Sequence, residues 1–200
     1  MTAISSDLVK QLRDKTGAGM MDCKRALEET GGDMEKAIEH LRKKGAATAA
    51  RRADKSANQG VIESYIHAGG RIGAIVELNC ETDFVAKTPD FKQLAHDIAM
   101  QIAAMNPRYI SRDQIDKAVV EKEVEIYKSQ SMHEGKPPNI AEKVAQGRLE
   151  KYYQEVCLME QSFIKDSGKT IKDLLDDQTG KVGEKVVIRR FTRFQLGEES

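Results

Sequence analysis

Apolar side chains recur three and four positions apart over residues 1–44, the spacing of one buried face on an α-helix. Ser5 or Ser6 can cap a first helix, the glycine-containing segment 16–19 interrupts the pattern, and Asp33 can cap a third helix. So little apolar surface makes a core that is marginal by itself. The predicted module therefore has three short helices with these positions inward: Leu8, Val9, Leu12, Cys23, Ala26, Leu27, Met34, Ala37, Ile38 and Leu41.

The period changes from helical to alternating after Gly60. Alternating apolar and polar residues predict strands over 61–66 and 72–80, and the glycines between them favour an antiparallel hairpin. A last strand is expected after a turn at 179–183. It places four apolar side chains on one face: Val186, Ile188, Phe194 and Leu196.

Further helices separate these strands, and capping or breaking residues set their bounds. They are expected from Pro89 to Pro107, over about 112–133 after Ser111, from a capping box of Asn139 and Glu142, and from Thr170 to Leu175. The predicted fold class is α+β, with an antiparallel sheet of about three strands and helices on one side. The predicted division is a three-helix domain over 1–44, a linker over 45–58 and an α+β core over 59–200.

The linker is rich in Ala, Arg and Lys but has no apolar stripe, so we expect it to be mobile or semi-helical. It carries Arg51, Arg52 and Lys55 with only Asp54 opposing them. These cations suit a nucleic-acid or ribosome contact, or simply a solvated linker. The second interpretation is favoured, because no aromatic residue accompanies the charges for base stacking.

Composition and charge point to a protein partner. The chain has 32 Lys and Arg against 32 Asp and Glu, so it lacks the basic excess typical of nucleic-acid binding. Three cysteines, far apart and odd in number, fit a reducing compartment better than a disulfide framework. No apolar run is long enough to cross a bilayer, and the first residues lack a signal-peptide pattern. We expect a cytoplasmic protein that binds no membrane.

The motifs of common active sites are absent. There is no GxxxxGK[ST] loop, no GxGxxG, no CxxC and no GxSxG, and the four histidines are not at metal-ligand spacing. A thiol enzyme using Cys80 or Cys157 stays open, but both fall in apolar patterns where a buried, unreactive cysteine is usual. We therefore expect no catalytic residue, no metal and no cofactor.

One segment does not resemble scaffolding: Thr82, Asp83, Phe84, Val85, Ala86 and Lys87, which follow a strand and precede a proline-opened helix. A large apolar residue in such a polar loop is either a core plug or an exposed anchor. From the residues alone the plug is favoured. The alternative is a wedge, since an exposed aromatic side chain can dominate an interface.

A second such segment runs from Arg13 through a glycine-containing loop to Met20 and Met21. Methionine is frequent at adaptable contact surfaces. Two adjacent methionines therefore indicate a soft apolar contact. The competing interpretation, one methionine in the core and one exposed by chance, is about as good.

Long motifs resemble one family. LVKQLRDKTGAGMMDCKRALEETGGDMEKAIEHLRKKG closely resembles the N-terminal signature of elongation factor Ts, a three-helix module similar to ubiquitin-associated (UBA) domains. ELNCETDFVAK resembles its second signature, and MEQSFIKD, TIKDLL and VGEKVVIRRFTRFQLGE are similar to its core domain. The resemblance covers essentially the whole chain.

The resemblance implies a guanine nucleotide exchange factor for the translation GTPase elongation factor Tu, with no covalent chemistry of its own. By this resemblance Arg13, Met20 and Met21 would contact the nucleotide-binding domain of the GTPase. Asp83 and Phe84 would insert near the helices that flank its Mg²⁺ and phosphate site, which makes Phe84 the wedge. The small domain alone leaves a rival open, a UBA-like binding module with another partner.

One departure from the family pattern concerns oligomeric state. Longer members carry a duplicated core subdomain and a helical hairpin insert, whereas this chain has a single core copy, like the short members. If full contact needs two core copies, two chains can supply them. We therefore expect a homodimer built through the core, and a complex of two factors with two GTPases.

Overall fold

The computed structural model describes residues 4–198 and has an α+β fold. The chain divides into two compact units, and the strands β1, β2 and β5 and the helix α5 each pass from one unit to the other. The first unit takes the described residues as far as Glu63, then Val76–Asp97 and Asp173–Arg189. The second takes Ser64–Ile75, Ile98–Lys172 and the described residues from Arg190 onward.

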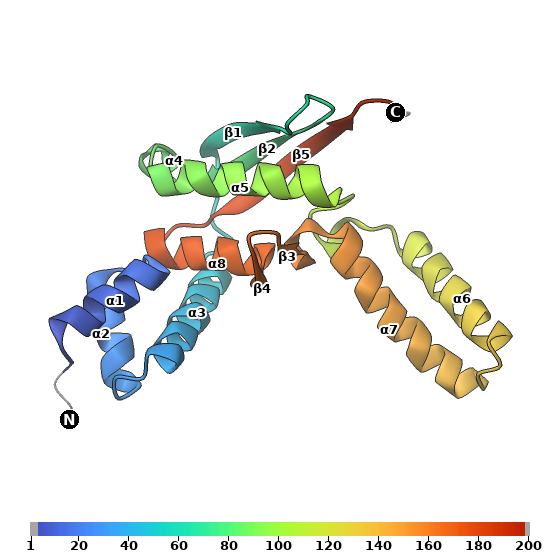
Figure 1. The fold of residues 1–200 in the computed structure, drawn as a ribbon, viewed down its shortest axis with the longest axis horizontal. Coiled ribbons are helices and arrows are strands. Elements are labelled where there is room, and N and C mark those ends of the chain that lie inside the picture. The colour runs from blue at the N-terminus through green and yellow to red at the C-terminus, as the bar shows by residue number, and fades with distance from the viewer. Residues whose placement is uncertain (1–3, 199–200) are drawn as a thin grey trace. The chain divides into compact units, whose positions relative to one another are not determined.

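The first unit begins with three helices, α1 (Ser6–Thr16), α2 (Met20–Glu29) and α3 (Met34–Arg51) (Figure 1). Their caps follow from the sequence. Ser5 Oγ accepts a hydrogen bond from the Leu8 amide at 3.2 Å, and Asp33 Oδ1 accepts one from the Lys36 amide at 3.1 Å. The predicted apolar positions make one buried cluster: Val9, Leu12, Cys23, Ala26, Leu27 and Ala37.

Two glycines set the contact between α3 and α8 (Ile171–Val182). A Cβ atom on Gly45 would lie 2.9 Å from the Asp176 carbonyl oxygen, and one on Gly180 would lie 2.9 Å from the Gly45 Cα. Arg42 also pairs with Asp173 at 3.0 Å. The three-helix module therefore packs directly on α8, at a distance that only glycine permits.

Residues 45–58 are partly helical, because α3 continues to Arg51. The rest of the segment is fastened to its surroundings. Lys185 Nζ donates to the carbonyls of Ala53 and Lys55 at 2.5 and 3.0 Å, and Asn79 donates to the Ala57 carbonyl at 3.1 Å. Of the two forms predicted for the linker, mobile or semi-helical, the structure has the semi-helical one.

The sheet has three antiparallel strands in the order β1–β2–β5: Gln59–Ile66, Ile72–Cys80 and Val187–Gln195. The predicted hairpin is confirmed, and His67 donates its amide to the Ile72 carbonyl across the turn at 2.9 Å. Helix α5 (Pro89–Met105) runs along the sheet (Figure 1). His96 contacts Glu63 in the first unit, and Arg193 Nε donates to the Ala103 carbonyl in the second.

The second unit holds a helical hairpin of α6 (Lys117–His133) and α7 (Pro138–Val156). It also contains the 3₁₀ turns η1 (Arg112–Gln114) and η2 (Leu158–Glu160) and a small ribbon of β3 (Ser162–Phe163) and β4 (Asp166–Thr170). Arg112 bonds to Glu150 and Glu160 and lies 4.1 Å from the centre of the Tyr153 ring. This arginine ties both 3₁₀ turns to α7.

Several predicted element boundaries are wrong. Asp116, not Ser111, caps α6, because η1 occupies the intervening residues. The capping box at Asn139 does not form, since α7 begins two residues earlier, with Pro137 as its N-cap and Pro138, whose φ is fixed, as its first residue. Helix α8 passes Leu175 and reaches Val182, and the sequence did not predict the ribbon of β3 and β4.

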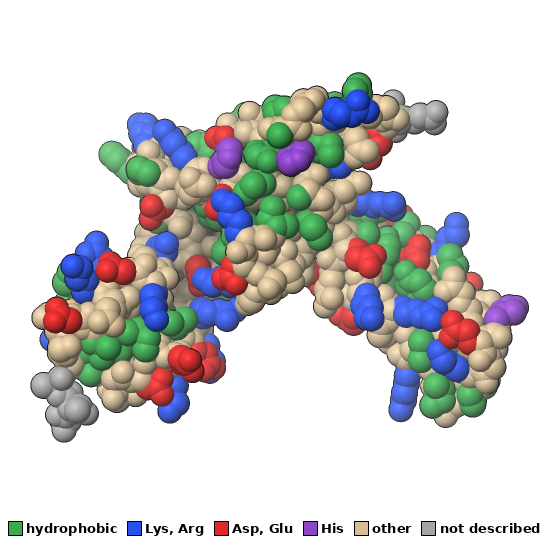
Figure 2. Space-filling model, in the orientation of Figure 1, with side chains coloured by type: hydrophobic (Ala, Val, Ile, Leu, Met, Phe, Trp, Pro, Cys, Tyr) green, Lys and Arg blue, Asp and Glu red, His purple; other side chains and the backbone are tan. Residues whose placement is uncertain are grey.

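Two general properties bear on function. Figure 2 shows basic and acidic side chains interspersed over the visible face, in keeping with their equal numbers. Within residues 4–198, no helix is both long and apolar enough to cross a membrane.

Candidate functional site

Among residues 4–198, Phe84 is the most exposed of the large apolar side chains, at 79%. It lies on α4 (Asp83–Ala86), a single helical turn between β2 and α5. Ala86, two residues later, is buried and faces the opposite side, because two helical residues are about 200° apart. Ala86 takes the inward position, so the prediction from the residues alone, that Phe84 plugs the core, is wrong.

Asp83 and Lys87 form an ion pair along the exposed side of the same turn, with 2.5 Å between Oδ2 and Nζ. The hydrogen bond from Lys87 lowers the pKa of Asp83 below its usual value. Asp83 is therefore a carboxylate at neutral pH. Beside Phe84 it offers a charged acceptor, as the sequence suggested, although Lys87 already occupies one of its oxygens.

The base of this turn is fastened by two glutamates. Thr82 donates its amide to Glu184 Oε2 at 3.0 Å and its hydroxyl to Glu184 Oε1 at 2.7 Å. Glu81 Oε1 accepts the Lys185 amide at 2.6 Å, and both Glu81 oxygens accept from Arg52, at 3.0 and 2.8 Å. The Lys185 amide, and after it the Arg52 guanidinium, lowers the pKa of Glu81.

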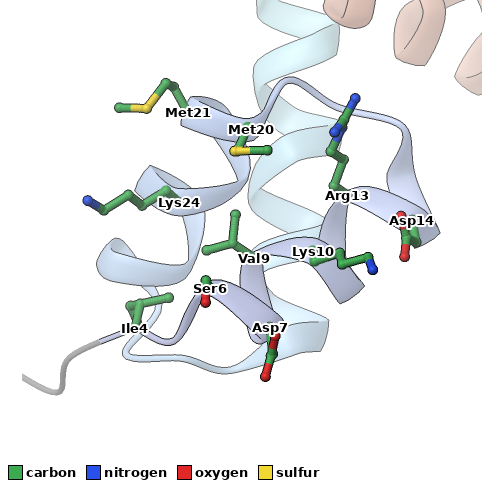
Figure 3. Close-up of a pocket in the computed structure, with 10 residues that line it drawn as sticks. All are labelled: Ile4, Ser6, Asp7, Val9, Lys10, Arg13, Asp14, Met20, Met21 and Lys24. Atoms are coloured by element: carbon green, nitrogen blue, oxygen red, sulfur yellow. The ribbon is translucent and has the colours of Figure 1, made fainter.

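A groove lies on the three-helix module, between α1 and α2, with a volume of about 600 Å³ (Figure 3). Figure 3 shows Val9 between Met20 and Ile4, with Lys24 and Lys10 on opposite sides. Met20 and Met21 are 58% and 63% exposed. The lining residues are Ile4, Ser6, Asp7, Val9, Lys10, Arg13, Asp14, Met20, Met21 and Lys24.

The structure thus brings the predicted site residues into two surfaces within the first unit. Arg13, Met20 and Met21 line the groove, and Thr82 to Lys87 form the turn around Phe84. The sequence did not indicate Glu184, nor four of the groove residues: Ile4, Asp7, Lys10 and Lys24. A lone glutamate in a charged segment carries no sequence signal, and a groove requires helix packing that periodicity does not specify.

The described residues give little support to a cysteine-based or metal-based active site. All three cysteines are free and buried, and burial raises the pKa of the Cys80 and Cys157 thiols to about 11. Neutral buried thiols are poor nucleophiles. Within residues 4–198, no group of three or more His, Cys, Asp or Glu side chains could hold a metal ion.

Comparison with known proteins gives the same family along nearly the whole chain. A family model described as elongation factor Ts matches residues 2–198. Elongation factor Ts of Carboxydothermus hydrogenoformans is 61% identical over 195 residues, which cover 98% of this chain and 90% of the relative. The Desulforamulus reducens protein of the same name is 59% identical over 198 residues, covering 99% and 91%. That of Moorella thermoacetica is 58% identical over 190 residues, covering 95% and 94%.

Proposed function

The chain belongs to the elongation factor Ts family, and from that premise we propose that it is the guanine nucleotide exchange factor of elongation factor Tu. It promotes release of GDP from this GTPase and stabilises the nucleotide-free form. It carries out no covalent chemistry and needs no cofactor. The observation that carries the proposal is Phe84, exposed on a helical turn whose base is held by Glu81 and Glu184.

The mechanism follows from linkage. GDP is held in such GTPases by backbone amides around its phosphates and by Mg²⁺. A factor that binds the empty GTPase better than the GDP form must weaken GDP binding by the same ratio. Phe84 inserts near the Mg²⁺ and phosphate site and displaces a helix, and Asp83 stabilises the shifted arrangement. GTP then enters and, in excess, displaces the factor.

Burial of Phe84 in the GTPase supplies enough free energy for a large acceleration of GDP release. Each tenfold in release rate requires about 1.4 kcal/mol. A buried phenylalanine side chain contributes roughly 3–5 kcal/mol, by analogy with Phe→Ala losses in cores. Phe84 alone can therefore supply about a thousandfold acceleration if it is buried only in the opened GTPase.

The groove supplies the second contact in this proposal. Arg13, Met20 and Met21 bind the nucleotide-binding domain of the GTPase, the methionines through their apolar side chains. Ala86 is buried, so its part in binding is to support the turn rather than to touch the partner.

We also propose that the chain forms a homodimer through its core. In the second unit, Ile66, Ile75, Phe194 and Leu196 are exposed and line a groove of about 420 Å³. Apolar residues gathered in this way mark interaction surfaces. Light scattering at micromolar concentration tests the proposal. We expect a dimer mass for the wild type and a monomer mass for Phe194→Asp, whereas a monomeric wild type would contradict it.

The proposal places the protein in the cytoplasm, where translation occurs, with protein partners and no nucleic acid. Arg52 supports this, because it is engaged by Glu81 rather than free for phosphate. A steep salt dependence of RNA binding would argue for the opposite.

The decisive experiment is stopped-flow release of fluorescent GDP from elongation factor Tu. The wild-type chain should accelerate release by orders of magnitude and in a saturable way. No acceleration would refute the exchange function. A pull-down dominated by a different protein would then favour the UBA-like binding module.

A further inference from the structure

Two segments of the first unit exchange hydrogen bonds reciprocally. Glu184 accepts the amide of Thr82, and Glu81 accepts the amide of Lys185. Each glutamate thus accepts from the backbone N–H of the residue that follows the other glutamate. Residues 81–82 directly follow β2, and residues 184–185 lead into β5. We call residues 81–82 and 184–185 the carboxylate clamp.

The clamp acts where the helical turn of Phe84 begins. Thr82 is the N-cap residue of α4, yet its side chain makes no capping bond; its hydroxyl donates to Glu184 instead. A four-residue helix has too few internal hydrogen bonds to persist alone. Glu184 occupies both of its oxygens with this one residue, and hydrogen bonds to a charged acceptor are the strong ones.

The same turn carries the residue that the proposed function requires most. Phe84 is exposed and makes little contact that would fix its direction, so its placement depends on α4. Cys80 adds one bond from its Sγ to the Thr82 carbonyl at 3.1 Å, but a thiol is a weak donor. The carboxylate clamp at the start of the turn, together with buried Ala86 at its end, therefore sets the direction of Phe84.

We propose that Glu184 is a positioning residue for nucleotide exchange, which acts by holding Thr82 so that α4 presents Phe84 outward. This inference rests on the proposed exchange function. Without the clamp the turn samples other conformations, and only a fraction of the bound factor presents Phe84 productively. The loss should fall on the maximal rate of GDP release, because the groove on α1 and α2 still binds the GTPase.

The principal test is Glu184→Gln, measured by stopped-flow GDP release over a range of factor concentrations. The substitution removes the charge of the side chain and replaces one acceptor oxygen with an NH₂ group. This donor then faces one of the two Thr82 donors, so one hydrogen bond is lost. We expect the maximal release rate to fall about tenfold, equivalent to about 1.4 kcal/mol. The half-saturating concentration should change less than about twofold. Glu150→Gln is the matched control, because it alters a carboxylate of equal type at Arg112, and it should behave as wild type.

A double-mutant cycle separates positioning from general damage. If Glu184 acts through Phe84, Glu184→Gln should cause no further loss in a Phe84→Ala background. An equal fold-loss in both backgrounds, or no loss in either, would overturn the proposal.

Thr82 provides a second variant in case Glu184→Gln does not fold. Thr82→Val removes the hydroxyl donor with little change of shape, whereas Thr82→Ser keeps both donors. Thr82→Val should therefore lower the maximal rate several-fold more than Thr82→Ser. Equal effects of the two would contradict the clamp.

Hydrogen exchange of the chain alone keeps this inference separate from the exchange function. The Thr82 amide should exchange about tenfold faster in Glu184→Gln than in wild type, whether or not any GTPase is present. If the wild type fails to release GDP, the proposed function is wrong. If the wild type works and the Thr82 amide is unchanged in Glu184→Gln, the positioning role is wrong.

Discussion

The two candidate contact surfaces differ in shape and in what holds them. The turn around Phe84 is convex, a single aromatic side chain raised on four helical residues and fixed by charged hydrogen bonds. The groove with Met20 and Met21 is concave and rests on an apolar cluster of its own. A convex anchor can enter and distort a partner, whereas a concave surface of flexible methionines adapts to one. We expect loss of the turn to reduce rate and loss of the groove to reduce affinity.

The largest effect is expected from Phe84→Ala. The maximal rate of GDP release should fall about a hundredfold or more, because burial of a phenylalanine in the opened GTPase is worth about 3 kcal/mol or more. Stopped-flow release at saturating factor measures it. Phe84 is exposed, so thermal unfolding of the variant should match wild type to within about 0.5 kcal/mol. If Phe84→Ala kept the full rate of GDP release, the wedge would not lie on this turn.

The groove should respond differently. Replacing both Met20 and Met21 with Ala should raise the half-saturating factor concentration about tenfold, equivalent to about 1.4 kcal/mol of binding, and leave the maximal rate near wild type. Met132→Ala, at an exposed methionine of α6, is the control and should change neither quantity. A fall in maximal rate without a change in affinity would remove the distinction between the two surfaces.

A third experiment tests the packing that joins the groove's helices to the rest of the first unit. Gly45→Ala adds a Cβ 2.9 Å from the Asp176 carbonyl, so α3 and α8 must separate. We expect a stability loss of roughly 1 kcal/mol in urea unfolding. Gly147→Ala in α7 meets no atom within 4 Å and should instead stabilise the chain by up to about 1 kcal/mol, through helix propensity. The same sign for both would mean that the close approach is unimportant.

The smallest effect is a pH dependence that compares the two supports: Glu81 at the base of the Phe84 turn, and the apolar cluster beneath the groove. The pKa of Glu81 is lowered, so its contribution to stability is present above the unfolded value of about 4.3 and is lost as the pH falls through the lower folded value. The amide proton shift of Lys185 in an NMR titration should follow this with a midpoint below about 4.3. The Ala26 amide, in the apolar cluster beneath the groove, should not follow it. A Lys185 midpoint at or above 4.3 would contradict the hydrogen bond to Glu81.

Local patterns predicted much of this fold. The caps at Ser5 and Asp33, the three-helix stripe and the hairpin after Gly60 depend on neighbours within a few residues, and all are found. Errors arose where distant residues decide. Gly180 suggests a turn by its identity, yet it lies within α8, where it packs closely on Gly45. The division into a small domain, a linker and a core stays a prediction.

By itself, the sequence determined the α+β class, the charge balance that favours a protein partner, and family signatures that identify Phe84, Met20 and Met21 as candidates. The residues alone favoured a buried Phe84 and the family resemblance an exposed one. The tertiary structure decided for exposure, since burial depends on which neighbour takes the inward position, and Ala86 takes it. Likewise, only the fold brings Glu184 to Thr82. Their contact spans 102 positions, a separation that no periodicity encodes.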